Sequence, residues 1–180
     1  MLQLYFLAIL PPSPLRGSVA NLKEEMRARY GAGHALKSPA HITLQMPFKR
    51  AEQDEARLAG VLGTWAAAQA SFPVELDGFG AFPPRVIYLR VVDHAPWQSV
   101  YASLQSMLRE ELGFAADELS ARFHPHLTIA TRDLAKKAFQ EAWPLYAHRP
   151  FQASFRAEAL TLLRHNGRHW NAILHFPFGT

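Results

Sequence analysis

Apolar residues recur along this chain with two spacings, one typical of strands and one typical of helices. An apolar run from residue 2 to 10 ends at two prolines, whereas Val19, Leu22 and Met26 fall at helical spacing. Similar patterns, separated by Gly and Pro, predict the remaining elements. The expected strands cover about 2–10, 40–46, 72–76, 78–82, 85–92, 126–130, 151–155, 157–164 and 169–176, and the expected helices about 14–30, 52–70, 96–112 and 133–143, with Asp133 capping the last.

The order of the expected elements repeats along the chain. Strand, helix, strand, helix and strand run from residue 2 to 82, and the same order begins again at residue 86. We see neither a low-complexity segment nor a flexible linker, so we expect one domain over 1–180, with pseudo-repeat halves of about 1–83 and 84–180. A protein with such pseudo-two-fold symmetry would place its two equivalent strands across a shared groove.

Those two equivalent strands carry the same short motif. Both His41-Ile-Thr43-Leu and His126-Leu-Thr128-Ile have the form His-x-Thr-x, with apolar residues at both x positions. Because side chains alternate between the faces of a strand, the His and Thr of each motif project from one face and the apolar residues point into a core. One copy is weak evidence, since a histidine on a half-exposed strand is common. Two copies with the same apolar frame favour a shared function.

Paired imidazoles suit chemistry at phosphorus. Histidine titrates near neutral pH, so one ring can accept a proton from an attacking oxygen while the other gives a proton to the departing oxygen. In-line displacement places those two oxygens on opposite sides of the phosphorus atom. Thr43 and Thr128, each beside its histidine, could donate hydrogen bonds to the non-bridging oxygens, where negative charge resides.

The motifs and their surroundings resemble the 2H phosphoesterase superfamily, specifically the 2′-5′ RNA ligase / cyclic phosphodiesterase-like proteins. Three segments carry the resemblance: HITLQMPF at 41–48, FGAFPPRVIYLRV at 79–91 and FHPHLTIATR at 123–132. The resemblance implies a bilobal α+β fold in which antiparallel sheets line a central cleft and helices lie outside. It also implies metal-independent chemistry on 2′,3′-cyclic or 2′-5′ phosphodiester ends of RNA or nucleotides, with His41, Thr43, His126 and Thr128 as the catalytic set.

Three further residues are candidates for substrate binding. Relatives often carry a basic residue shortly after the second motif, and here Thr131 intervenes, so Arg132 stands one place later. Arg85 begins a strand after two prolines, where it could contact phosphate. Phe48 could stack on a base as aromatic side chains do in single-stranded nucleic-acid sites, although core packing is the commoner fate of such a ring.

Composition narrows the remaining alternatives. The chain has no cysteine, which excludes disulfides and thiolate chemistry, and its net charge of +4 suits an anionic partner. We expect no cofactor, no metal and no membrane span, a cytoplasmic location and a monomer. Two alternatives stay open: an RNA- or nucleotide-binding module with little catalysis, and a metal-dependent phosphohydrolase in which His124 and His126 bind the ion.

Overall fold

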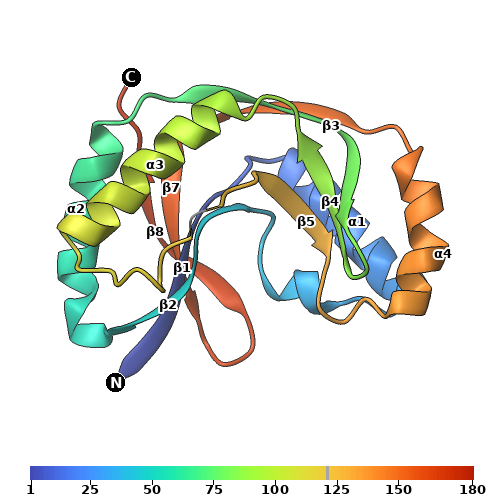
Figure 1. Cartoon of the computed structure of the whole chain (residues 1–180), viewed down its shortest axis with the longest axis horizontal. Helices are drawn as coiled ribbons and strands as arrows, with labels where there is room; N and C mark the ends of the chain where they lie inside the picture. Colours follow the sequence, from blue (N-terminus) through green and yellow to red (C-terminus); the bar gives the residue numbers. More distant parts are fainter. Residues whose placement is uncertain (121) are drawn as a thin grey trace.

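The protein is an α+β chain built on a single antiparallel sheet, seen in a computed structural model that describes residues 1–120 and 122–180 (Figure 1). The strands are β1 (Leu2–Ile9), β2 (Ile42–Ala51), β3 (Phe72–Phe82), β4 (Val86–Val91), β5 (His126–Ala130), β6 (Gln152–Ala157), β7 (Ala159–His165) and β8 (Trp170–Pro177). The helices are α1 (Leu15–Tyr30), α2 (Glu55–Ala67), α3 (Ala95–Glu110) and α4 (Lys136–Ala147), with short 3-10 turns η1 (His34–Lys37) and η2 (Glu52–Asp54).

The two expected sheets are two halves of one curled sheet. Its strand order is β6-β3-β4-β5-β2-β1-β7-β8, so β5 and β2, which carry the two His-x-Thr motifs, lie at the centre. The third strand of the first sequence half crosses over, because β3 pairs with β4 and β6, whereas β7 pairs with β1 and β8. Each half of the sheet therefore contains strands from both sequence halves.

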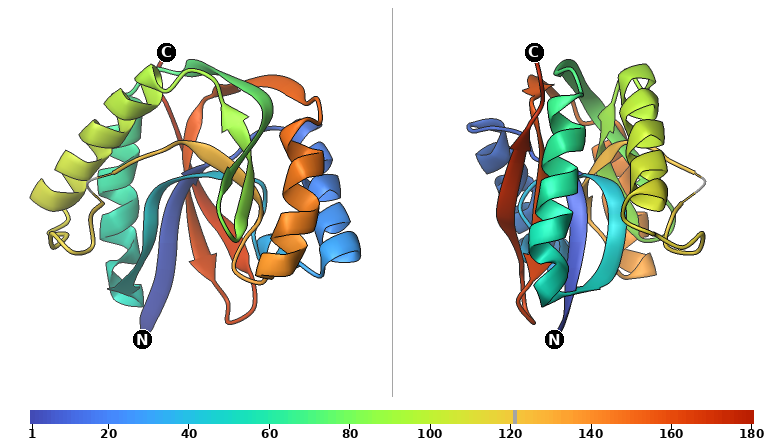
Figure 2. Two further views of the ribbon diagram at one scale, coloured as in Figure 1. Left: turned by 45° about the vertical axis from the view of Figure 1, so that its right-hand side comes forward. Right: turned by 90° about the vertical axis from the view of Figure 1, so that its left-hand side faces the viewer.

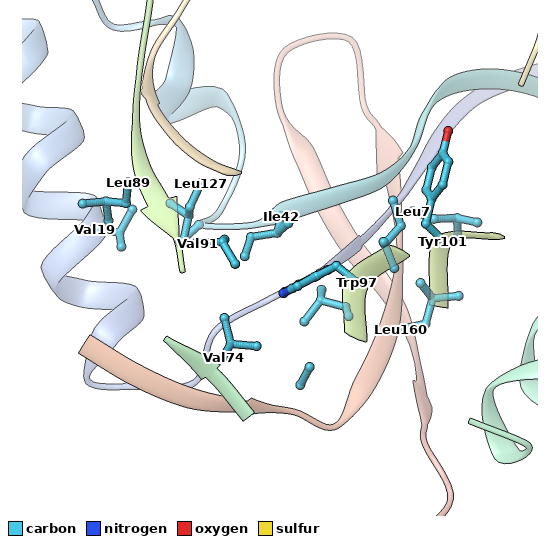
Figure 3. Packing of buried hydrophobic residues seen from close by; sticks show 14 of the residues in the cluster. Leu7, Val19, Ile42, Val74, Leu89, Val91, Trp97, Tyr101, Leu127 and Leu160 are labelled. Atoms are coloured by element: carbon cyan, nitrogen blue, oxygen red, sulfur yellow. The ribbon is translucent and has the colours of Figure 1, made fainter. Parts of the chain in front are cut away.

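The helices flank the sheet in two pairs. Helices α2 and α3 lie beside one half of the sheet, and α1 and α4 beside the other (Figures 1 and 2). The main core takes Tyr5, Leu7 and Ile9 of β1. It also takes Ile42 and Leu127, which Figure 3 shows with Leu7 among the buried residues. Phe6 and Ala8 point the other way and form a small second cluster with Leu163. The sheet thus has a helix-covered face and a second, less covered face.

Two local expectations are wrong. The segment 72–82 is one strand, not two, because Gly78 adopts a φ of 66° and the register shift beside it bends the strand without ending it. Asp133 does not cap α4, since that helix begins only at Lys136. Its Oδ2 instead accepts hydrogen bonds from the N–H groups of Gly33 (3.0 Å) and His34 (2.9 Å), which fixes the loop after β5 to the start of η1.

Among residues 1–120 and 122–180, no helix combines the length and the apolar character that crossing a membrane requires.

Substituting Gly80 with Ala should destabilise the fold. The ring of Tyr88 lies directly over Gly80, and a Cβ at residue 80 would overlap that ring. We expect Gly80→Ala to lower the free energy of unfolding by about 1–3 kcal/mol, as overpacking does. Gly60→Ala is the matched control, because nothing lies within 4 Å of its Cβ position in α2 and Ala should raise stability there by about 1 kcal/mol. Equal urea midpoints for wild type and Gly80→Ala would contradict the close approach.

Candidate functional site

The two His-x-Thr motifs lie side by side at the centre of the sheet. Ile42 of β2 pairs antiparallel with Leu127 of β5, and both side chains are 0% exposed. Because side chains alternate along a strand, the residues on either side of this pair project from the opposite face, away from the main core. The four predicted catalytic residues are those neighbours, and each is half-buried: His41, Thr43, His126 and Thr128.

The two imidazoles are close enough to interact electrostatically. Because Ile42 lies opposite Leu127 in an antiparallel pair, His41 lies opposite Thr128 and diagonally across from His126. Diagonal neighbours of this kind have Cα atoms about 7–8 Å apart. A positive charge on His126 lowers the pKa of His41. The structure therefore brings together the two histidines that the sequence singles out.

Both rings are anchored in the same way. Nδ1 of His41 lies 2.7 Å from the carbonyl oxygen of Pro39, and Nδ1 of His126 lies 2.6 Å from the carbonyl oxygen of His124. A carbonyl oxygen only accepts, so each Nδ1 must carry the proton and donate it. Each neutral ring then has its lone pair on Nε2. In both motifs the carbonyl two residues upstream thus fixes the tautomer and the orientation of the ring.

Burial keeps both rings neutral at pH 7. It lowers the pKa of His41 to about 4; the hydrogen bond to Pro39 opposes this shift, and the charges of Lys23 and His126 reinforce it. Burial also lowers the pKa of His126, with its hydrogen bond to the His124 carbonyl opposing and the charge of the His124 ring reinforcing the shift. An anion placed between the rings would act in the opposite direction, because negative charge favours the imidazolium.

Aromatic rings pack against both imidazoles. The Phe6 ring packs against His41 with a centroid separation of 4.9 Å. On the other strand, the rings of Phe82 and Tyr88 each lie 5.1 Å from the His126 ring. The Tyr88 side chain is 6% exposed, and its hydroxyl lies 3.4 Å from Nε2 of His124. Apolar walls of this kind strengthen any electrostatic interaction between the imidazoles and a bound anion.

The two threonines lie beside the histidines. Thr43 and Thr128 share the sheet face of the histidines and are half-buried. Within the described ranges, neither hydroxyl has a hydrogen-bond partner in the protein. Both hydroxyls are therefore able to donate to an oxygen atom of a bound group.

The three expected substrate contacts fall in different places. Arg85 is exposed in the turn between β3 and β4, next to Phe82 at the rim of the site. Arg132 is exposed, has a φ of 53° and lies near His34, whose pKa its charge lowers. Phe48 is a wrong prediction for base stacking: it is 4% exposed and packs against Phe114 with centroids 4.9 Å apart. Phe48 pairs with the buried Tyr5 of β1, and the two rings stack in the core with centroids 5.9 Å apart.

Two residues near the site do not stand out in the sequence. For Phe6 the pattern indicates only a buried strand, and the pairing of β1 with β2 is what brings its ring to His41. Lys23 is 3% exposed on α1, and its Nζ donates to the Ser38 carbonyl at 2.9 Å in the loop before His41. The sequence does hint at the burial of Lys23, since this residue stands four residues after Val19 on the apolar side of the helix.

The His124 and His126 rings, which one alternative treats as metal ligands, lie 6.1 Å apart between centroids. Apart from residue 121, which is not described, the chain contains no group of three or more His, Asp or Glu side chains arranged to hold a metal ion.

Comparison with known proteins identifies the family. The model of the 2′-5′ RNA ligase superfamily matches residues 11–169. The chain belongs to this superfamily. A protein of Geobacillus kaustophilus that is provisionally named a phosphoesterase is 29% identical over 141 residues, which is 77% of this chain and 75% of the relative. A second such protein, from Geobacillus thermodenitrificans, is 30% identical over 137 residues, 75% of this chain and 73% of the relative.

Several solved structures share the fold. TT0787 of Thermus thermophilus superposes with a TM-score of 0.69 at 22% identity, covering 98% of this chain and 97% of that chain. LigT of E. coli in its apo form also gives a TM-score of 0.69, at 21% identity, with coverage of 100% and 99%. E. coli LigT has also been crystallised with 3′-AMP, in a structure that gives a TM-score of 0.64 at 21% identity and 100% coverage of both chains.

Titration of His41 tests the electrostatics of the site. Burial and the charge of Lys23 both disfavour the imidazolium, so we expect a pKa of about 4 for His41 in the free protein. Removing the positive charge with Lys23→Met should raise this pKa. Long-range ¹H–¹⁵N NMR spectra recorded from pH 3 to 8 measure the His41 pKa in the wild type and in the variant. At pH 7 the spectra of the wild type should show a protonated Nδ1 and an unprotonated Nε2 on His41. A wild-type pKa at or above the ordinary 6.5 would contradict the account.

Proposed function

We propose that this member of the 2′-5′ RNA ligase superfamily is a metal-independent phosphodiesterase or phosphotransferase acting on 2′,3′-cyclic or 2′-5′ phosphodiester ends of RNA or nucleotides. The observation that carries the proposal is the pair of imidazoles on one sheet face, each with Nδ1 bound to a carbonyl oxygen and with no hydrogen bond to Nε2 from the described residues. Membership of a family with phosphoesterase-named relatives supports the reaction class. The E. coli LigT complexes with 3′-AMP and ATP support a nucleotide as the ligand.

The proposed reaction needs one base and one acid. Burial lowers the pKa of His41 to about 4, so this ring is neutral and serves as the base. Its Nε2 takes a proton from water as the water oxygen attacks phosphorus. The bond from phosphorus to one ribose oxygen breaks on the opposite side. His126, protonated in the substrate complex, gives the proton on its Nε2 to that oxygen. The products are a ribose hydroxyl and a phosphate monoester, and the two histidines have exchanged protonation states.

The threonines and the rings around the histidines assist the same step. The hydroxyls of Thr43 and Thr128 donate hydrogen bonds to the non-bridging oxygens, where charge accumulates in the transition state. Phe82 and Tyr88 limit water around His126, which strengthens its attraction to the bound phosphate. Both proton transfers are provided by side chains, so the proposed reaction requires no metal ion.

Substitution of either histidine should abolish most of the activity. We expect His41→Ala and His126→Ala each to lower kcat/KM for a nucleoside 2′,3′-cyclic phosphate by a factor of about 10²–10⁴, because each removes one proton transfer. The assay contains EDTA, and circular dichroism checks the fold of each variant. His148→Ala, which removes an exposed histidine after α4, is the control and should retain full activity.

Three outcomes separate the alternatives. Wild-type rates in both histidine variants would contradict the two-histidine mechanism. Activity that EDTA abolishes and zinc or manganese restores would favour a metal-dependent phosphohydrolase. Tight nucleotide binding without turnover of any 2′,3′-cyclic or 2′-5′ substrate would favour a binding module.

The pH dependence of kcat/KM follows from the two lowered pKa values. Below the His41 pKa of about 4 the base is protonated and the rate falls, and above the His126 pKa, which burial holds below 6.5, the acid has lost its proton and the rate falls again. Since kcat/KM reports the free enzyme, we expect a bell-shaped profile with its maximum on the acidic side of pH 7. A flat profile, or a maximum at pH 8 or above, would argue against this assignment.

A further inference from the structure

A basic cavity of about 400 Å³ adjoins the loop that leads into His41. It lies between α1, the segment 36–40 and the start of β8, and three of its lining residues are cationic: Arg16, Lys23 and Lys37. His169, Trp170 and Asn171 also line it. No Asp or Glu side chain is among the described residues that line it. The cavity therefore carries an excess of positive charge that no lining carboxylate neutralises.

Lys23 is the buried cation of this cavity. Among the described residues its side chain forms a single hydrogen bond, from Nζ to the Ser38 carbonyl, although an ammonium group has three protons to donate. In the described part of the chain it forms no ion pair with a carboxylate. Burial lowers its pKa to about 8, which still leaves it mostly charged at pH 7. A buried cation without a counter-charge is costly unless an anion joins it.

The cavity lies next to His41 along the chain, because its lining includes Pro39 and Ala40. Pro39, whose carbonyl anchors the His41 ring, lines the cavity, and the charge of Lys23 reaches His41. The Trp170 ring lies 4.7 Å from the Phe6 ring, which in turn lies 4.9 Å from the His41 ring. One aromatic ring, Phe6, therefore separates His41 from the Trp170 wall of the cavity, so the two places are near neighbours.

We propose that the cavity is a second phosphate subsite, in which Lys23, Arg16 and Lys37 bind the phosphate that neighbours the reacting one on the same nucleotide or RNA strand. This inference rests on the proposed function. Successive phosphates of a nucleotide chain are separated by a single nucleoside, so a substrate with its reacting phosphate at His41 presents the next one close by. The substrate class is then a nucleotide or RNA end with at least two phosphates, in preference to a bare nucleoside cyclic phosphate.

Two ligands that differ by one phosphate test the subsite. Calorimetry at constant ionic strength compares adenosine 3′-phosphate with adenosine 3′,5′-bisphosphate on the wild-type protein. We expect the bisphosphate to bind about tenfold more tightly, the gain typical of one charge-assisted contact. The double variant Arg16→Gln/Lys37→Gln removes two exposed cations of the cavity, so the fold is retained, and it should reduce this gain to about twofold or less. Lys37→Arg, introduced alone, keeps the charge and should keep the gain.

The control is Lys137→Gln, which removes an exposed charge on α4 outside the cavity. The gain from the second phosphate should stay at its wild-type value in this variant. A loss as large as in the double variant would mean that overall charge, not the cavity, attracts the phosphate, and would overturn the inference. Equal wild-type affinities for the two ligands, or no binding of either, would overturn it as well.

The binding gain, set beside the turnover assay of the proposed function, separates this inference from that function. A tenfold gain together with no turnover of any cyclic phosphate would leave the subsite standing and reject the proposed reaction. Turnover of a nucleoside 2′,3′-cyclic phosphate together with no gain from the second phosphate would retain the reaction and reject the subsite.

Discussion

The pairing of β2 with β5 is the contact on which the site depends. A single described residue pair, Ile42 with Leu127, joins the two halves of the sheet. Both side chains are fully buried, so the pairing is held by the main core and not by the polar residues beside it. Alternation along the strands then places two imidazoles and two hydroxyls on the opposite face. A slip of one residue in either strand would bury a histidine and expose an isoleucine or leucine, and hydrophobic burial opposes that slip.

Burial also determines what the two rings can do. The carbonyls of Pro39 and His124 fix the tautomers, and the rings of Phe6, Phe82 and Tyr88 pack against the imidazoles and partly shield them from water. The result is a pair of neutral histidines that lack an anion to stabilise their protonated forms. Binding a phosphodiester would provide that anion, so substrate binding and protonation of one ring are coupled. The nearby Lys23 works in the same direction, because its positive charge favours an anion close to His41.

Much of this arrangement is readable from the sequence because it depends on local patterns. The strand alternation in both motifs predicts the shared face of His and Thr, and the repeated element order predicts that β2 and β5 are equivalent. The crossing of β3 and β7 between the halves of the sheet is a non-local choice that periodicity does not encode. The fate of Phe48 and Asp133 likewise depends on partners far along the chain: Phe114 for the ring, and Gly33 and His34 for the carboxylate. Lys23 is hard to predict because a lysine is normally exposed, and its burial follows from the loop that folds over α1.

The most direct measurement is an NMR experiment that observes both imidazoles while adenosine 3′-phosphate is added. If the two histidines act on one phosphate, the Nε2 signals of His41 and His126 should both move with the same dissociation constant, and both Nδ1 atoms should stay protonated because their carbonyl partners do not change. A response from only one of the two rings, or from neither at saturating ligand, would contradict the central claim.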